Sequence, residues 1–456
     1  MTAPVSSVIY PQPSAGDIAR LPLPPGSFGL PLLGETLEYL RSPPEFIGRR
    51  YRRHGNVFRT HLLGAPMVFL IGSDALRFSF AGENKYLQQR WPYSMRRLFG
   101  AEGTNLLVGE VHKERRRVLG PHFAFNAMRG FVPTMEAIAK KHLARWSEQS
   151  GVLTIVPAVR AMILEILSTL ILSDEPVDQA RLGRLCHDWF AGLVVPIPLD
   201  LPGTAFGRAL AAKREIGALL GAVVDRRMKL ATQPDDVLAG MLSVRDDANR
   251  PLSRQAIVDE IMNLMIAGQD TTISATGNLL LLLAQHPDVL RRCREEQDGI
   301  AIEGGLTLDH LKSMPYLNQT VQEAMRFITP VANATRATTQ DVACAGYRIP
   351  KDWTVALCLA GTHHASTPWT DPERFDPDRF GPERAEHKRE ACPYVPFGGG
   401  PRVCLGQHLA MVEMSVIVAL MLRGYRWELL PDQDLRMNHI PVPSPKSGIK
   451  VRFSRR

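Results

Sequence analysis

The 456-residue sequence lacks several features that would mark common classes of protein. Its six cysteines include no Cys-x-x-Cys pair, which excludes a dense disulfide framework and favours a reducing compartment. No run reaches the roughly 18 consecutive apolar residues that a membrane span needs. Residues 1–24 contain prolines and serines but no apolar signal region. These absences predict a cytoplasmic protein with no membrane span.

Long runs of one charge are also missing. Lys and Arg number 54 against 46 Asp and Glu, a net charge of +8, but the basic residues form neither a tail nor a dense cluster. Nucleic acid is therefore not expected as a partner, whereas an acidic protein partner fits the positive charge. The hydrophobic share of 45% is enough for a large core and excludes wholesale disorder.

Helical periodicity dominates the rest of the chain, as in residues 135–146, 159–172 and 208–230. Residues 253–284 form the longest such stretch, which opens with the capping residue Ser253 and would extend about 48 Å. Short β-like runs occupy only residues 57–62, 66–71, 347–349 and 353–358. The pattern predicts a mainly α fold with a small β portion (α+β). A proline-rich arm (1–40) is expected to precede one catalytic domain (41–456).

The most informative segment runs Phe-Gly-Gly-Gly-Pro-Arg-Val-Cys-Leu-Gly from Phe397 to Gly406. Three successive glycines allow a tight turn, and apolar residues recur at helical spacing after the cysteine. Cys404 is therefore predicted at a helix N-terminus, whose partial positive charge stabilises a thiolate. Such a thiolate is a metal ligand or a nucleophile; the alternative is a buried structural cysteine.

This spacing, with Phe397, Gly400, Arg402, Cys404 and Gly406 in place, resembles the haem-thiolate loop of cytochrome P450 monooxygenases. The resemblance covers the chain from Pro24 to its C-terminal strands and implies the P450 fold, with a long central helix across the haem. It implies haem b as cofactor, Cys404 as the axial iron ligand and Arg402 as a propionate partner. A zinc site at Cys404 and His408 is not expected, because no second ligand pair has usable spacing.

Within the long helix, residues 267–272 read Ala-Gly-Gln-Asp-Thr-Thr, and several of these are poor helix formers. The residues alone are compatible with a tolerated polar patch or with a widened turn beside a ligand. They resemble the family's oxygen-activation motif. The resemblance implies that Thr271 hydrogen-bonds dioxygen, that Asp270 relays protons, and that Ala267 and Gly268 leave room over the iron.

Two further patterns gain meaning from the resemblance. Glu323 and Arg326 lie at i,i+3 on a helix, usually a weak surface pair, but in the family such a pair joins a downstream arginine, here Arg379, in a structural triad. His112 and Arg116 lie at i,i+4 on a basic helix that is otherwise read as a solvated face. The resemblance makes them propionate partners together with Arg336, because buried carboxylates need cationic partners.

Residues 24–31, 91–100 and 192–199 resemble the retinoic-acid hydroxylase branch, which has cyanobacterial and animal members. The substrate pocket is then expected to include the residues Trp91, Arg96, Phe99, Pro196, Val331 and Ala332. Trp91 and Phe99 offer flat walls for a retinoid, terpenoid or fatty-acid-like molecule. Arg96 is a partner for a substrate carboxylate, or else a propionate contact or a surface charge.

The sequence departs from its relatives in two places. They carry a Gly-Gly-Phe-Arg-like run where this chain has Asn-Ala-Thr-Arg at residues 333–336, so Thr335 is expected to change the shape and polarity of the pocket. The usual His-Arg-Asp-Pro reads His-His-Ala-Ser at residues 363–366. That region is expected to brace the fold.

The expected reaction is insertion of one oxygen atom of O2 into a C–H bond of a lipophilic small molecule. No flavin or iron–sulfur domain is visible, so electrons are expected from a separate ferredoxin or flavodoxin and its reductase. Docking is expected near the basic residues Lys113, Arg117 or Arg389. The alternatives are an H2O2-driven peroxygenase and a non-enzymatic haem protein that binds gases.

Overall fold

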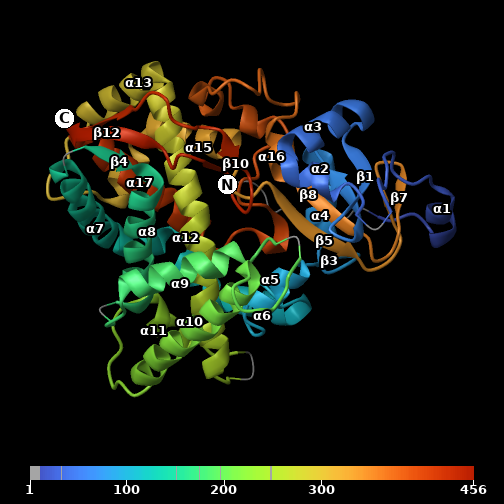
Figure 1. Ribbon diagram of the computed structural model, residues 1–456, viewed down its shortest axis with the longest axis horizontal. Helices are drawn as coiled ribbons and strands as arrows, with labels where there is room; N and C mark the ends of the chain where they lie inside the picture. Colours follow the sequence, from blue (N-terminus) through green and yellow to red (C-terminus); the bar gives the residue numbers. More distant parts are fainter. Residues whose placement is uncertain (1–10, 32, 150, 174, 196, 247–248) are drawn as a thin grey trace. The chain divides into compact units, whose positions relative to one another are not determined.

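The computed structural model describes residues 11–31, 33–149, 151–173, 175–195, 197–246 and 249–456. Helices account for about 53% of the chain and strands for a small share, which confirms the mainly α prediction. The chain forms two compact units, each built from two separated stretches (Figure 1). We call residues 1–91 with 325–404 the β-rich unit, and residues 92–324 with 405–456 the helical unit. One catalytic domain after an N-terminal arm stays a prediction.

The β-rich unit is organised around a five-stranded sheet with the order β1-β2-β8-β5-β3, in which β2 and β8 are parallel and the other pairs antiparallel. Its strands are β1 (Val57–Leu62), β2 (Ala65–Leu70), β3 (Leu87–Gln89), β5 (Asn333–Thr338) and β8 (Thr354–Cys358), with the hairpin β6 (Val342–Cys344) and β7 (Tyr347–Ile349) beside it. Its helices are α1 (Ala15–Arg20), α2 (Thr36–Arg41), α3 (Pro43–His54), α4 (Ser73–Gly82) and α16 (Leu359–His363). The four short β-like runs of the sequence thus all become strands, within one or two residues of the expected ends.

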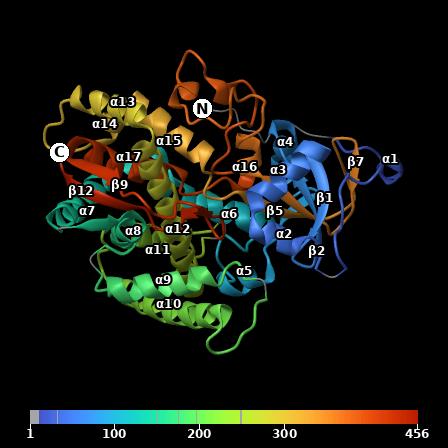
Figure 2. The ribbon, with the colours of Figure 1, turned by 45° about the horizontal axis from the view of Figure 1, so that its top comes forward.

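Apolar side chains of the sheet explain how this unit packs. Along β1 the buried positions alternate with partly exposed ones through most of the strand, as a strand with one covered face requires. Phe58 of β1 stacks on Phe69 of β2 at 5.2 Å between ring centroids, and both belong to a cluster with Phe46 of α3. Helices α2 and α3 therefore lie against β1, as Figure 2 shows. The N-terminal arm also reaches this sheet, since Pro25 accepts a hydrogen bond from the Arg59 N–H.

The helical unit contains most of the helices. They are α5 (Tyr93–Leu98), α6 (Gly109–Leu119), α7 (Met128–Glu148), α8 (Ile155–Leu172), α9 (Gln179–Ala191), α10 (Ala205–Arg227), α11 (Val237–Ser243), α12 (Arg254–Gln285), α13 (Pro287–Asp298), α14 (Leu308–Lys312) and α17 (Gln407–Gly424). A small sheet of order β4-β12-β9 joins β4 (Val152–Thr154), β12 (Lys450–Arg455) and β9 (Tyr425–Leu429), and β10 (Met437–Asn438) pairs with β11 (Ser444–Pro445). Helix α15 (Pro315–Phe327) crosses the boundary between the units.

Helix α12 is the long helix expected from residues 253–284. Ser253 caps its N-terminus by accepting a hydrogen bond from the Ala256 N–H, as the capping pattern predicted. Most of its residues are buried, because α8, α10 and α17 pack around it (Figure 1). A helix that is apolar on most sides needs such cover.

Two helices are long and apolar enough to cross a membrane by composition, Ile155–Leu172 and Gln407–Gly424. In each, 61% of the residues are buried inside the protein. Both also pack on α7. Core helices of globular proteins show this combination of apolar sequence and burial.

Candidate active site

The cysteine loop, residues 397–404, is closed by its own backbone. The Cys404 N–H donates to the Phe397 carbonyl at 2.9 Å, and the Val403 N–H donates to Gly400 at 3.1 Å. Gly398 and Gly400 have positive φ values of 69° and 64°, which explains the glycines there. Gly399 is needed for another reason, because a Cβ atom on it would lie 2.5 Å from the Phe80 ring of α4.

The helix that follows the loop begins later than the sequence predicted. Helix α17 starts at Gln407, with Gly406 as its N-cap, so Cys404 precedes the first helical residue by three positions. The prediction of Cys404 at the helix N-terminus was wrong in this detail, because the Cys404 N–H is used to close the loop.

Cys404 differs from the other five cysteines in its accessibility. It is exposed, whereas Cys186, Cys293, Cys344, Cys358 and Cys392 are buried. Burial raises the pKa of Cys358 to about 12, and it raises the pKa of the other buried thiols as well. Cys404 is therefore the thiol that an external metal can reach. A structural role in a core, the alternative left open by the sequence, does not fit its exposure.

Two predicted propionate partners lie together in the β-rich unit. Arg336 of β5 and Arg402 of the cysteine loop both form ion pairs with Glu83, the residue that follows α4. The Arg402 Nε lies 3.1 Å from the Glu83 Oε1, and the Arg336 Nε contacts Oε2 of the same carboxylate. All three side chains are at most 8% exposed. Sequence reasoning missed Glu83, which belongs to no motif.

The motif in α12 presents one open face on an otherwise buried helix. Ala267 is exposed and Gly268 and Thr271 are partly exposed, whereas Gln269 and Asp270 are buried. The helix remains α-helical throughout the motif, so the widened turn was a wrong expectation. The Thr271 hydroxyl instead donates to the Ala267 carbonyl at 2.5 Å. Gly268 also serves helix packing, because a Cβ atom there would lie 3.2 Å from Leu167 of α8.

Asp270 is held by an arginine that the sequence analysis missed. Arg160 of α8 donates to the Asp270 Oδ1 at 2.6 Å, and the aspartate is only 4% exposed. Burial raises the pKa of Asp270 above its ordinary value, and the Arg160 guanidinium opposes that rise. One signal was present in the sequence: Arg160 is one of only two charged residues in the apolar helix 155–172.

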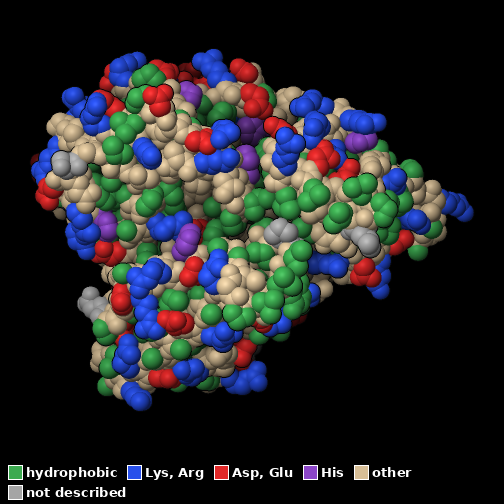
Figure 3. Space-filling view, in the orientation of Figure 1, with side chains coloured by type: hydrophobic (Ala, Val, Ile, Leu, Met, Phe, Trp, Pro, Cys, Tyr) green, Lys and Arg blue, Asp and Glu red, His purple; other side chains and the backbone are tan. Residues whose placement is uncertain are grey.

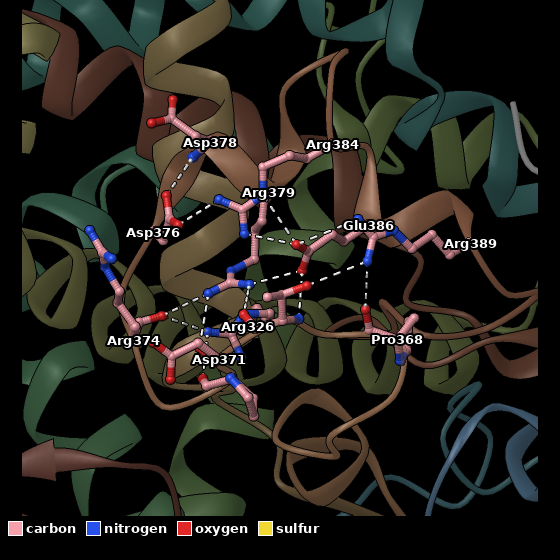
Figure 4. A network of polar contacts seen from close by, with 12 residues as sticks. Arg326, Pro368, Asp371, Arg374, Asp376, Asp378, Arg379, Arg384, Glu386 and Arg389 are labelled. Carbon is pink, nitrogen blue, oxygen red and sulfur yellow. Dashed lines mark hydrogen bonds and ion pairs between the residues drawn. The ribbon is translucent and has the colours of Figure 1, made fainter.

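The structural triad is part of a larger arginine cluster, drawn in Figure 4. Arg326 donates to the carbonyls of His363 at 2.7 Å and Pro372 at 2.9 Å, and Arg379 donates to Thr370 at 2.8 Å. Both arginines share the Arg374 carbonyl. Arg379 also pairs with Glu386, at 2.9 Å, an acid that the sequence analysis did not name. Glu323, the first triad residue, is fully buried on α15.

His363 links this arginine cluster to the cysteine loop. Its Nε2 accepts a hydrogen bond from the Val395 N–H at 2.9 Å, so the neutral ring carries its proton on Nδ1, 2.7 Å from the Thr329 hydroxyl. Burial lowers the pKa of His363 well below its ordinary value, and the nearby Arg326 guanidinium adds to the effect. The bracing expected of this region thus has a geometric basis.

The remaining predicted residues fall in both units. In the helical unit His112 is buried on α6, Arg116 is half-buried, Arg96 is exposed on α5, and the Phe99 ring packs on Trp189. In the β-rich unit Val331 is exposed, and Trp91 and Ala332 are partly exposed. The Thr335 hydroxyl donates to the Arg90 carbonyl at 2.6 Å. Pro196 lies outside the described residues.

Other kinds of site find little support in the described part of the chain. It contains no group of three or more His, Cys, Asp and Glu side chains that would hold a metal ion. On the face drawn in Figure 3, Lys and Arg side chains are spread among the others and form no broad patch. An iron held by a porphyrin needs only one axial protein ligand, which Cys404 would supply.

Known proteins resemble this chain over almost its whole length. Putative cytochrome P450 120 of Synechocystis is 35% identical over 440 residues, 96% of this chain and 98% of the relative. Cytochrome P450 26B1 of Mus musculus is 31% identical over 95% of this chain and 87% of its own. Abscisic acid 8'-hydroxylase 2 of Arabidopsis thaliana is 31% identical, covering 95% of this chain and 90% of the relative.

The structure described as retinoic acid bound cyanobacterial CYP120A1 superposes with a TM-score of 0.90 at 35% identity, covering 96% of this chain and all of that one. The family model for cytochrome P450 matches residues 24–453. The donor set described above fits haem, because an exposed cysteine on a glycine loop would supply the axial sulfur and a buried arginine pair would suit two propionates. The chain belongs to the cytochrome P450 family of haem b monooxygenases.

Proposed function

We propose that this monooxygenase hydroxylates a lipophilic carboxylic acid of the retinoid or terpenoid kind. The observation that carries the proposal is the similarity to the retinoic acid bound cyanobacterial structure, at a TM-score of 0.90. A plant relative named as a hydroxylase of abscisic acid, another isoprenoid acid, supports the same class. The reaction consumes the substrate, O2, two electrons and two protons, and it yields the alcohol and water.

The residues of the cysteine loop and its neighbours would hold the cofactor. Cys404 would be the axial iron ligand, with Phe397 beside the sulfur and with Gly400 and Gly406 shaping the loop. Arg336 and Arg402, together with His112 and Arg116, would bind the propionates. When bound, haem with a thiolate ligand supplies the activation of dioxygen. The residues of this chain would position the substrate, exclude water and supply protons.

Asp270 and Thr271 would deliver those protons. Asp270 has a raised pKa, so its carboxyl group can take up a proton more readily than an exposed aspartate. Arg160 donates to its Oδ1 at 2.6 Å, so the proton would be carried on Oδ2. The Thr271 hydroxyl donates a hydrogen bond to the Ala267 carbonyl at 2.5 Å, so its oxygen can still accept a hydrogen bond from another donor. Ala267 and Gly268 would keep side-chain bulk away from this face.

Arg96 is the proposed partner of the substrate carboxylate. It is exposed on α5, in the helix that also carries Arg97. Arg97 donates to the Tyr93 hydroxyl at 3.0 Å, so it already has a partner on its own helix. Trp91, Phe99, Val331 and Ala332 would provide apolar walls for the carbon chain, as would Pro196, which is not described.

A binding and turnover experiment tests the substrate class. Retinoic acid, abscisic acid, a fatty acid and a steroid would be titrated into the ferric protein while the iron spin state is followed, and the products of the tightest binder identified. We expect an isoprenoid acid to bind tightest and to gain one hydroxyl group. Tighter binding of the fatty acid or of the steroid would contradict the proposal.

Variants refine the test. Arg96→Gln should weaken binding of the acid about tenfold, the worth of one charge-assisted hydrogen bond, and leave binding of the matching alcohol unchanged. Arg97→Gln is the matched control, with no effect on either ligand. Thr271→Ala should uncouple electron use from product, whereas a peroxygenase driven by H2O2 would keep its rate. A protein that bound haem but shifted its spin state with none of these ligands would instead favour the gas-binding alternative.

Electrons would come from a separate ferredoxin or flavodoxin and its reductase. Lys113, Arg117 and Arg389 are the proposed contacts for an acidic partner; the side chains of Lys113 and Arg389 are 53% and 46% exposed. Charge reversal at each should slow reduction and flatten its dependence on salt. The same reversal at Arg436, 78% exposed, serves as the control. Equal effects at all four positions would contradict the docking site.

We also propose a cytoplasmic location.

A further inference from the structure

We infer that Glu83 is a positioning residue, whose carboxylate holds Arg336 and Arg402 together as one receptor for the two haem propionates. This inference rests on the proposed propionate role of the two arginines. It adds a residue of opposite charge, one that would touch the arginines and not the haem.

The contacts of Glu83 are divided between its two oxygens. Oε1 accepts from the Arg402 Nε at 3.1 Å, and Oε2 accepts from the Arg336 Nε. The side chain of Glu83 is 2% exposed, and those of Arg336 and Arg402 are 6% and 8% exposed. A shared buried carboxylate fixes both guanidinium planes relative to each other, because charge-assisted hydrogen bonds are directional.

The backbone around Glu83 is equally constrained. Glu83 directly follows α4, and the Lys85 and Tyr86 N–H groups donate to the Gly82 carbonyl in a tight turn. A Cβ atom on Gly82 would lie 2.3 Å from the Tyr86 ring, so the turn is closely packed. Strand β3 follows this turn and pairs with β5, in a register that places Gln89 opposite Arg336.

The other side of Glu83 is fixed to the cysteine loop. Phe80, three residues earlier, packs against Gly399 and Gly400, where added Cβ atoms would lie 2.5 and 3.0 Å from it. The end of α4 therefore contacts the cysteine loop twice, through Phe80 and through the Glu83–Arg402 pair. The same segment contacts β5 through Arg336. The two ion pairs of Glu83 therefore connect strand β5 to the cysteine loop.

Two measurable consequences follow. Long arginine side chains lose conformational entropy when they are held in place. Because Glu83 already orders Arg336 and Arg402, haem binding would not have to order them. Without its carboxylate, the arginines would be disordered or mutually repelled, and haem would leave faster. A negative charge beside the proposed propionate site would also be lost. This would disfavour the ferric state of a bound haem, so the midpoint potential would become more positive.

The experiment compares Glu83→Gln with wild-type holoprotein. Haem transfer to excess apomyoglobin gives the rate of haem loss, and a spectroscopic redox titration gives the midpoint potential. Glu83→Gln should lose haem about tenfold faster, in the range of one buried charged hydrogen bond, and have a more positive potential. Glu35→Gln is the matched control: Glu35 pairs with Arg50 at 2.6 Å in the same unit, and its loss should change neither readout.

Two further variants keep the outcome decisive. Glu83→Asp retains the charge but shortens the side chain, so it should speed haem loss less and leave the potential close to wild type; it also serves if Glu83→Gln does not fold. Unchanged or slower haem loss in Glu83→Gln would overturn the inference, since the carboxylate would then be neutral or a competitor of the propionates. Arg402→Lys separates failure of the Glu83 inference from failure of the propionate proposal. If this variant also retains haem normally, the proposed propionate role fails as well.

Discussion

The β-rich unit contains two buried clusters of arginines that are built differently. In the first, Arg326 and Arg379 donate mainly to backbone carbonyls, and Glu386 adds a carboxylate (Figure 4). In the second, Arg336 and Arg402 share the side chain of Glu83. Both clusters are nearly inaccessible to solvent, so burial alone does not distinguish them.

The kind of acceptor makes the difference. A backbone carbonyl is fixed by the fold, so an arginine bound to several of them ties segments of the chain together and has a structural role. Arg326 and Arg379 in this way connect residues 363, 370, 371, 372 and 374. In the second cluster a shared carboxylate orients two cations toward each other, which suits the recognition of an anionic ligand. Arg336 also donates to a backbone carbonyl, but that carbonyl belongs to its chain neighbour Thr335 and ties no distant segment. The first cluster should therefore govern stability and the second should govern retention of haem.

Substitution of Arg379 should give the largest effect. Arg379→Lys keeps the charge but loses the planar fork that reaches Thr370, Asp371 and Arg374, and the carbonyls of these residues lose their donor. We expect the free energy of unfolding to fall by about 3–5 kcal/mol, as for other broken buried networks. Urea unfolding followed by circular dichroism measures this. Arg384 is more exposed, and Arg384→Lys should lower the free energy of unfolding by about 1 kcal/mol or less. Equal losses of stability in the two variants would contradict the structural role of Arg379.

Glu413 of α17 is a buried acid with no arginine partner among the residues that the structure describes. It is 1% exposed, its Oε1 has no hydrogen-bond partner among the described residues, and burial raises its pKa to about 8. Because the unfolded carboxyl titrates near 4.5, stability is lost as the pH rises from that value toward 8. Glu413→Gln should remove the loss and stabilise the protein at pH 8 by on the order of 3 kcal/mol relative to its effect at pH 5. A pH-independent effect of the variant would contradict this account.

The sequence predicted the long helix, the cysteine loop and the arginines of both clusters. Periodicity and one capping serine were sufficient for α12, because a long buried helix depends on local pattern. The cysteine loop was recognisable because backbone closure and exposure require glycines at fixed positions. Arg326 and Arg379 were found through their motif, and Arg336 and Arg402 through theirs.

The side chains that complete these sites were not predictable. Glu386 lies only seven positions from Arg379, but no motif marks it. Glu83 and Arg160 act through contacts between segments far apart in the chain, and Glu83 meets Arg336 more than 250 positions away. No local spacing encodes such a pairing. The widened turn in α12 failed for the opposite reason, since poor helix formers were counted but the packing of Gly268 against Leu167 was not visible. Tertiary contacts overrode local propensity there.

Arg336→Lys sharpens the contrast with Arg379→Lys. The lysine keeps a positive charge near Glu83 but loses the guanidinium donors to Glu83 and to the Thr335 carbonyl. The fold should survive with a cost of about 1–2 kcal/mol, the net worth of one or two hydrogen bonds. Haem loss to apomyoglobin should nevertheless be about tenfold faster, which corresponds to about 1.4 kcal/mol. The opposite pattern, a large loss of stability with normal retention of haem, would show that this second cluster is structural too.

The smallest effect concerns the histidine that connects the first cluster to the cysteine loop. His363 must stay neutral, because its Nε2 accepts the Val395 N–H and its pKa is held well below 6.5. The unfolded chain binds a proton at this ring as the pH falls below 6.5 and the folded chain does not, so stability should decline on acidification by about 1.4 kcal/mol per pH unit at most. Thermal unfolding of His363→Gln between pH 7 and 5 should show a shallower decline than wild type. If the His363→Gln variant keeps the wild-type slope, protonation of His363 does not contribute, and the link between the arginine cluster and the cysteine loop tolerates a charged ring.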